Sequence, residues 1–384
     1  MPAKFNHHHM IAHLNSPSGS EALELENLAL AERKMRGLRR AGLFGEDTKG
    51  AVIRRACTAD ELRRAYRLVH DVFTDTGFLR PEPSGLRLRI FETTSETATF
   101  IAEKDGEVVG VISVVGDSPD LGLPSDAAFK PELDAMRASG SRLCELTNQA
   151  VTAAYRKSAV PTELMRCAIA HALRAGYQGS VAAVSPSHFG FYGLLGFESL
   201  GSERSYSEKL YDPVIALRLN LNRLRNPAPG LSGTAEFIVR FATETNPFLS
   251  LVDDWGKSAR KHFLNAELLD QLFVQPGNFL AERSAAEMRI LQRRWGRELL
   301  QVLTGNVDFD ALQELATSAK SAPTEPFREL GFPLLPAPAY FWTPEPPRSV
   351  WKLLKLRLTA WARPHEDRTG HLGNPEQLWS YPSL

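Results

Sequence analysis

A chain of 384 residues is long enough for one large domain or for two domains of ordinary size. Its residues are 43% hydrophobic and 23% charged, which is close to the globular average and excludes wholesale disorder, collagen and coiled coil. Because 45 basic residues balance 45 acidic ones, no overall electrostatic attraction to nucleic acid is expected.

The cysteine content and the N-terminal residues indicate the cellular compartment. Three cysteines cannot form a disulfide framework, and their spacing matches no zinc motif. The N-terminus lacks the apolar segment and the small-residue cleavage site of a signal peptide. We therefore expect a cytoplasmic protein without a bound metal.

Residues 1–48 are predicted to be a mobile terminus followed by one helix. Apolar residues between charges favour a helix over residues 21–40, which Gly42 and Gly45 end. The three histidines at 7–9 could bind a metal loosely, but such tracts are compositional signals, and a mobile terminus is the simpler interpretation.

Residues 49–222 alternate between strands and helices. Residues 51–56 predict a strand, and Thr58 with Glu61 three positions later forms a capping box that opens a helix reaching Gly77. An Asp-Gly turn between two apolar runs predicts a hairpin. The remaining pattern predicts helices over 125–138, 162–175 and 188–195, and strands over 97–103, 107–115, 142–152, 181–184, 199–206 and 214–221. This layout is typical of an α/β domain.

Beyond residue 222 the strand pattern ends. A linker-like break over residues 226–230 lies near the start of a predicted helical region over residues 223–320, with helices for example around residues 263–273 and 281–303. Residues 321–384 form a proline-rich tail, in which residues 351–358 are basic and amphipathic. That segment predicts either contact with a membrane surface or an acidic carrier protein, or an ordinary packed segment.

The order of these elements, with Tyr192 to Phe197 reading Tyr-x-x-x-Gly-Phe, resembles the GNAT acyltransferase fold over about residues 52–221. Three further patterns are similar to the FeeM-like N-acyl amino acid synthases, which are relatives of the acyl-homoserine lactone synthases. They are Pro186-x-His188-x-x-Phe191-Tyr192, Glu145-x-Thr147-x-x-x-Val151, and Tyr66-Arg67-Leu68 with Val72-Phe73. The resemblance implies a GNAT-like mixed twisted sheet flanked by helices, with an added mainly helical C-terminal region.

The same resemblance implies a reaction. A fatty acyl group would move from acyl carrier protein, or from coenzyme A, to the amine of an amino acid or another small molecule. The acyl thioester would be a co-substrate, so no cofactor is expected to be bound permanently. No covalent enzyme intermediate is required, because the amine can attack the thioester directly.

Such a reaction requires a neutral amine, a polarised carbonyl and a protonated thiolate. Glu145, inside an otherwise apolar strand, is a candidate to take the ammonium proton. Backbone N–H groups around Gln149 to Val151 are candidates to hold the carbonyl oxygen. The resemblance implies that the Tyr192 phenol protonates the thiolate. The alternatives are a half-exposed charge for Glu145 and a packed core tyrosine for Tyr192.

A second set of residues is expected to bind substrates. Arg156, Lys157 and Ser158 precede a helix that starts near Pro161, where a donor phosphate would meet free backbone N–H groups. A solvated loop is the alternative. His188 is predicted to be a general base or a substrate contact, or else to cap a turn.

Other polar residues are weaker candidates. Arg67 and Asp71 are expected to contact the amine substrate or to be surface charges. Cys144 and Cys167 are expected to be small buried apolar groups rather than nucleophiles. Alternation along the strand places Cys144 and Glu145 on opposite faces.

The chain also departs from the related families. Residues 156–161 contain no glycine, so this loop brings its backbone less easily against a pyrophosphate, which favours a carrier-protein arm over coenzyme A. Asn148 and Asp71 stand where the lactone synthases carry arginines, which argues against S-adenosylmethionine as substrate. Two other functions stay open: a non-catalytic GNAT-fold binding module, and a protein acetyltransferase that uses acetyl-coenzyme A.

Overall fold

The computed structural model describes residues 19–40, 42–206, 213–231, 233–259, 266–276 and 279–304. The chain divides into two compact units, Met1–Phe263 and Leu264–Leu384. The histidine tract at residues 7–9, the proline-rich tail and the amphipathic segment 351–358 lie outside the described residues. Within the described residues, no helix is long and apolar enough to cross a membrane.

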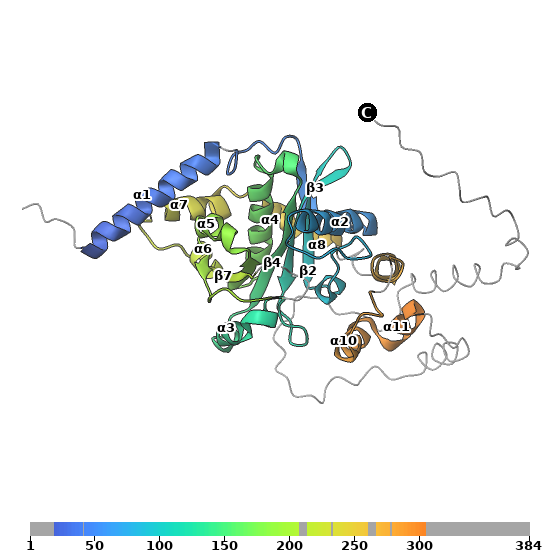
Figure 1. The fold of residues 1–384 in the computed structure, drawn as a ribbon. Coiled ribbons are helices and arrows are strands. Elements are labelled where there is room, and N and C mark those ends of the chain that lie inside the picture. Colours follow the sequence, from blue (N-terminus) through green and yellow to red (C-terminus); the bar gives the residue numbers. More distant parts are fainter. Residues whose placement is uncertain are drawn as a thin grey trace, which may run out of the picture. The chain divides into compact units, whose positions relative to one another are not determined.

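The first unit is built on one mixed sheet of seven strands in the order β1-β2-β3-β4-β5-β7-β6 (Figure 1). All neighbouring strands are antiparallel except β4 and β5, which are parallel. The strands are β1 (Val52–Arg55), β2 (Thr97–Lys104), β3 (Glu107–Gly116), β4 (Leu143–Val151), β5 (Gly179–Val184), β6 (Glu198–Ser199) and β7 (Ile215–Asn220). The predicted fold class, a GNAT-like mixed sheet flanked by helices, is confirmed.

Helices cover both faces of this sheet. The α-helices of the unit are α1 (Gly19–Arg40), α2 (Ala59–Asp75), α3 (Asp126–Ala138), α4 (Val160–Arg174), α5 (Phe189–Gly193), α6 (Leu221–Arg225), α7 (Gly233–Val239) and α8 (Phe248–Ala259). Short 3₁₀ turns are η1 (Ile90–Thr93), η2 (Ala153–Tyr155) and η3 (Pro186–His188), and η4 (Arg240–Glu244) is a π-helical turn.

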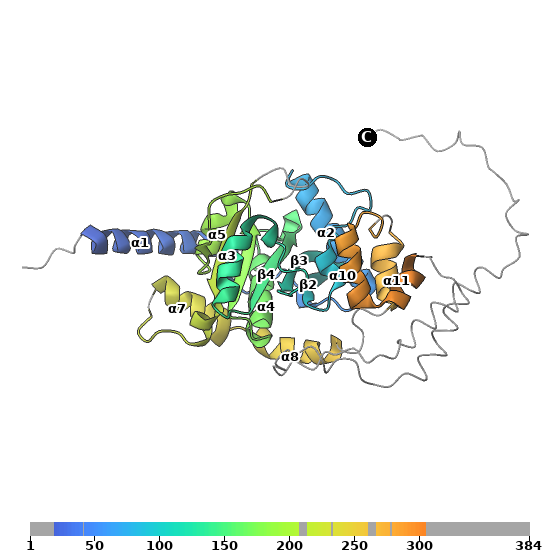
Figure 2. The same cartoon turned by 90° about the horizontal axis from the view of Figure 1, so that it is seen from below.

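The α2 and α4 helices lie on opposite faces, as the neighbours of two adjacent β2 residues show. Thr99 accepts or donates a hydrogen bond with the Tyr66 phenol of α2 at 3.3 Å. Phe100 packs its ring 5.4 Å from the His171 ring of α4. Because successive strand residues point to opposite faces, α2 covers one face and α4 the other (Figure 2).

The central feature of the sheet is that β4 and β5 part. They pair only over Leu143–Glu145 and Gly179–Val181, although β4 continues to Val151. A register shift against β3 and a left-handed φ of +55° at Asn148 mark a bulge in the unpaired half of β4. The second half of β4 therefore has β3 on one side and no strand on the other.

One strand of this unit differs from the sequence prediction. The strand expected over residues 199–206 is reduced to β6 and one isolated bridge between Arg204 and Val214. Arg204 instead reaches α3, where it donates to the Ala128 carbonyl at 2.8 Å and pairs with Glu132. These side-chain bonds hold the segment away from a regular ladder.

Helices after the sheet pack back onto α4. Arg166 donates to the Phe241 carbonyl at 3.0 Å, and Arg174 donates to the Leu249 carbonyl at 2.8 Å. The Asn246 amide donates to the Arg166 carbonyl at 3.0 Å. The first compact unit thus includes α6 to α8, whereas the predicted domain boundary lay at residue 222.

The second unit is helical over its described residues. It contains α9 (Ala266–Leu269), the π-helical turn η5 (Asp270–Val274), α10 (Ala285–Trp295) and α11 (Arg297–Thr304). The Phe273 ring lies 4.9 Å from that of Phe279 and 6.3 Å from that of Trp295. The predicted helix near residues 281–303 is divided at Gly296, whose φ is +86°.

Candidate active site

Tyr192 is tied to the bulged half of β4. Its phenol donates to the Gln149 side-chain oxygen at 2.9 Å, and the Gln149 amide donates to the Pro161 carbonyl of α4 at 3.0 Å. Tyr192 is buried, and burial raises the pKa of its phenol, so the proton is retained at neutral pH. The structure therefore brings together two predicted site residues, Tyr192 and Gln149.

Glu145 lies at the last residue pair before β4 and β5 part. Its side chain is buried, and Oε2 accepts a hydrogen bond from the Ser125 backbone N–H at 2.8 Å. Burial raises its pKa to about 7, against the opposing effects of the Ser125 hydrogen bond and the Arg89 charge. A carboxylate with this pKa can both accept and release a proton near neutrality.

Glu145 and Tyr192 occupy opposite faces of β4. Cys144 and Leu146 pack in the cluster that contains α4 and Tyr192, whereas Leu143 packs with Leu133 of α3. Glu145 shares the face of Leu143, next to the start of α3. No hydrogen bond joins Glu145 and Tyr192 directly within the described residues.

The Val151 backbone N–H points into the place that β5 vacates. The Thr152 N–H donates to the Val109 carbonyl of β3 at 3.0 Å, and Val151 faces Gly110 in the same ladder. Because N–H groups alternate in an antiparallel pair, the Val151 N–H points away from β3. This group has the direction that an oxyanion donor between the parted strands would need.

The three predicted phosphate-loop residues differ in accessibility. Arg156 is exposed, and its Nε donates to the Val151 carbonyl at 3.0 Å. Lys157 is exposed. Ser158 is buried; its hydroxyl donates to the Tyr155 carbonyl at 2.7 Å and accepts from the Val160 N–H at 3.2 Å. Ser158 therefore caps the start of α4 rather than facing solvent.

Residues 42–47 cover the start of α4. The Ala159 N–H donates to the Asp47 carbonyl at 2.9 Å, and the Phe44 N–H donates to the Thr162 hydroxyl at 3.2 Å. A Cβ on Gly42 would lie 2.8 Å from the Lys157 carbonyl oxygen, so the backbones touch. The N–H groups of Ala159 and Val160 are thus already bonded within the protein, and few remain for a pyrophosphate.

None of the other predicted candidates is hydrogen-bonded to Glu145 or Tyr192 within the described residues. His188 is exposed at the start of α5. Arg67 and Asp71 are exposed on α2. Cys144 and Cys167 are buried, as expected for apolar groups, and burial raises the pKa of the Cys144 thiol to about 12. Within the described residues, no group of three or more potential ligands could hold a metal.

A buried polar cluster beside Glu145 is absent from the sequence interpretation. Arg89 pairs with Glu92, with Nη2 and Oε1 2.6 Å apart, and donates to the Thr147 hydroxyl at 3.4 Å. The Asn148 amide donates to Glu92 at 3.1 Å. Burial lowers the Arg89 pKa, but Glu92 outweighs it, so the net pKa is raised and the guanidinium stays charged. In the sequence, the only indication of this buried cluster was the set of charged residues between positions 87 and 92.

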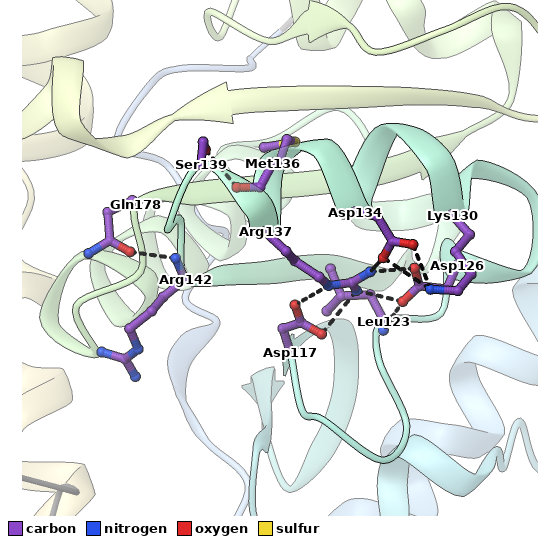
Figure 3. A network of polar contacts seen from close by, with 10 residues as sticks. All are labelled: Asp117, Leu123, Asp126, Lys130, Asp134, Met136, Arg137, Ser139, Arg142 and Gln178. Carbon is purple, nitrogen blue, oxygen red and sulfur yellow. Dashed lines mark hydrogen bonds and ion pairs between the residues drawn. The ribbon is translucent and has the colours of Figure 1, made fainter. Parts of the chain in front are cut away.

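A second polar network fixes the start of α3 (Figure 3). Ser125, directly before α3, contacts Glu145. Arg137 pairs with Asp117 at 2.7 Å and with Asp126 at 2.6 Å. Asp126 also accepts from the Leu123 N–H at 2.7 Å. This network holds the turn that delivers the Ser125 N–H to the Glu145 carboxylate.

We expect Arg137→Met to disturb Glu145 indirectly. Loss of the shared guanidinium should lower the free energy of unfolding by about 1–3 kcal/mol. A loosened Ser125 N–H would also raise the Glu145 pKa above its present value of about 7. Urea unfolding and the pH dependence of activity measure the two effects. Lys130→Met, which removes only an exposed pair with Asp134, is the control and should change neither.

Residues 64–220 match the family model described as N-acyl amino acid synthase FeeM, whereas no curated protein matches the chain. Among solved structures, FeeM, an N-acyl amino acid synthase from uncultured soil microbes, is 25% identical, with 49% of this chain and 97% of that chain covered and a TM-score of 0.42.

Two further solved structures are similar over about half of the chain. BjaI, a coenzyme A-dependent acyl-homoserine lactone synthase, is 19% identical, with 49% of this chain and 98% of that chain covered and a TM-score of 0.34. An N-acetyltransferase from Staphylococcus aureus Mu50 is 19% identical, with 45% of this chain and 99% of that chain covered and a TM-score of 0.34.

Proposed function

Because residues 64–220 match the family model of the N-acyl amino acid synthase FeeM, we propose that this N-acyltransferase transfers a long-chain acyl group from a carrier-protein thioester to an amino acid. The amine attacks the thioester carbonyl, so that a C–N bond forms and the C–S bond breaks. The observation that carries this proposal is the position of Glu145 and Tyr192 on either face of β4 where β5 leaves it.

Each group of the site then has a defined role. Glu145 takes a proton from the acceptor ammonium, and its pKa of about 7 suits that step near neutral pH. The Val151 N–H stabilises the negative charge on the carbonyl oxygen. Tyr192 exchanges its bond to Gln149 for one to the departing sulfur and donates the phenolic proton to the thiolate.

The covered start of α4 supports a carrier protein as donor. Coenzyme A carries a pyrophosphate and a nucleotide that need several free N–H groups at this helix start. Residues 42–47 already occupy that place through the bonds of Asp47 and Phe44. A phosphopantetheine arm has one phosphate, for which the exposed Arg156 and Lys157 are sufficient.

We expect Lys157→Glu to weaken the use of the carrier-protein donor. An acidic carrier protein and its phosphate would be repelled, so KM for the donor should rise about tenfold with kcat unchanged. The difference from the unsubstituted protein should shrink as salt is added, because exposed charges are screened. Arg223→Glu reverses an exposed charge on α6 and is the matched control. An unchanged KM would argue against this loop as the donor site.

The proposed function is tested by incubating the full chain with long-chain acyl carrier protein and a panel of amino acids and simple amines. Mass spectrometry should show an N-acyl amino acid, and thiol titration should show one free thiol per product. Parallel reactions contain long-chain acyl-coenzyme A, or acetyl-coenzyme A with protein substrates. If no reaction releases a thiol or forms a product, a non-catalytic module is favoured. If protein becomes acetylated, a protein acetyltransferase is favoured.

A further inference from the structure

The Arg87 side chain is a buried cation for which the described residues supply no hydrogen bond and no ion pair. It is 7% exposed, and its Nε is buried without a hydrogen bond. Within the described residues no carboxylate forms an ion pair with it, whereas Arg89, two residues further on, is held by Glu92. A buried guanidinium that is not paired destabilises the fold. Such a group is retained where a ligand supplies the missing anion.

Arg87 belongs to the buried cluster beside Glu145. Its backbone N–H donates to the Tyr66 carbonyl at 3.0 Å, which places Arg87 on the α2 side of the sheet. The Tyr206 phenol interacts electrostatically with Glu145 and with both arginines, Arg87 and Arg89. The Tyr206 phenol therefore lies near both Glu145, the proposed base, and the Arg87 guanidinium.

The Arg87 Nε is the unsatisfied group of this cluster. Buried polar groups are almost always hydrogen-bonded, so a buried guanidinium nitrogen without an acceptor indicates a polar ligand. The Ser125 hydroxyl, by contrast, lies close enough to the Glu145 carboxylate to lower its pKa.

The charges of the cluster define that ligand. Arg87 and Arg89 are cationic, and Glu92 neutralises one of them. Glu82 and Glu92 act on Arg87 electrostatically, but neither forms an ion pair with it within the described residues, so its guanidinium is left to bind another anion. A planar guanidinium binds a carboxylate through two parallel N–H···O bonds. In an amino acid the amine and the carboxylate are close neighbours, so a molecule held at Arg87 brings its nitrogen toward Glu145.

We propose that Arg87 binds the carboxylate of the acceptor and thereby selects free amino acids over amines that lack a carboxylate. This inference rests on the proposed function. The acceptor lies on the α2 side of β4, and the acyl thioester lies between the parted strands. One ammonium proton passes to Glu145 and the C–N bond forms. The C–S bond then breaks as Tyr192 protonates the thiolate, and the second proton lost by the nitrogen, carried through solvent, restores the phenol.

Steady-state kinetics test Arg87 with paired acceptors, each a free amino acid and its carboxamide. Arg87→Met should raise KM for the free amino acid by about 10- to 100-fold. It should leave kcat/KM for the carboxamide unchanged, because that acceptor has no carboxylate to lose. Arg87→Lys should restore part of the preference. Arg218→Met, on an exposed pair with Glu198, is the control. Equal effects on both acceptors would overturn the proposal.

Thermal unfolding supplies a readout that needs no acyl donor. Free amino acid should raise the Tm of the unsubstituted protein but not that of Arg87→Met. Without ligand, Arg87→Met should have the higher Tm, because an unpaired buried charge is removed. A lower Tm together with an unchanged response to the amino acid would show a structural role instead. If no amine is acylated at all, the proposed function fails, and this experiment still decides whether Arg87 binds a carboxylate.

Discussion

Replacement of Glu145 by glutamine is expected to reduce acyl transfer by about 10²- to 10⁴-fold, the usual contribution of a positioned general base. Glutamine keeps the size of the side chain and can still bond the Ser125 N–H, but it cannot take the ammonium proton. The rate of the unsubstituted protein should rise with pH through about 7 as Glu145 ionises, and the residual rate of the variant should not show this rise.

Glu198→Gln is the matched control for this experiment. It removes an exposed carboxylate on β6 and should leave both the rate and its pH dependence unchanged. A Glu145→Gln protein that retains most of its activity with an unaltered pH dependence would contradict the assigned role.

The same substitution has an expected effect on stability that does not depend on activity. The Glu145 pKa rises from an ordinary 4.5 to about 7 on folding, so its protonated form stabilises the fold below pH 4.5. That stabilisation is lost as pH increases from 4.5 to about 7, and it corresponds to about 3 kcal/mol. Relative to Glu145→Gln, the unsubstituted protein should therefore be less stable at pH 8 than at pH 5 by about this amount. Urea unfolding at both pH values measures the difference.

Tyr192→Phe is expected to lower kcat by about 10²-fold or more, because the leaving thiolate loses its proton donor. KM for the acceptor should change little, since Glu145 and the acceptor lie on the other face of β4. Loss of the bond to Gln149 should also lower the free energy of unfolding by about 1 kcal/mol. Burst or single-turnover kinetics with a quenched sample separate the chemical step from product release.

Tyr177→Phe is the control for the loss of a buried phenol. Tyr177 is largely buried and lies between α4 and β5, where its ring faces Arg142 at 5.3 Å. This variant should leave the single-turnover rate unchanged. If Tyr192→Phe and Tyr177→Phe slow the chemical step equally, Tyr192 has no special role in protonation.

Local signals in the sequence predicted most elements of the first unit. The capping box of Thr58 and Glu61 is present at the start of α2, and the Asp-Gly turn joins β2 to β3. These signals succeed because they depend on contacts between residues that are close in the chain. The strand predicted over residues 199–206 was wrong over most of its length, because Arg204 bonds to residues of α3 that lie far away in the sequence.

The candidate site was only partly predictable for the same reason. Glu145 was conspicuous as a charge inside an apolar strand, and Tyr192 stood in a recognisable motif. The sequence predicted that the Gln149 backbone would contact the carbonyl oxygen of the substrate. In the structure, the Gln149 side chain is the part that binds Tyr192. Arg87 could not be found, because only the folded chain shows that its guanidinium is buried and lacks a partner.

The central claim is that an acyl thioester lies between the parted strands β4 and β5, in reach of Tyr192 and of the Val151 N–H. A crystal structure of the full chain with a hydrolysis-resistant long-chain acyl pantetheine, in which a methylene separates sulfur from carbonyl, tests it most directly. We predict the sulfur within hydrogen-bond distance of the Tyr192 phenol and the carbonyl oxygen within hydrogen-bond distance of the Val151 N–H. An analogue bound elsewhere, with Tyr192 still bonded only to Gln149, would contradict the account.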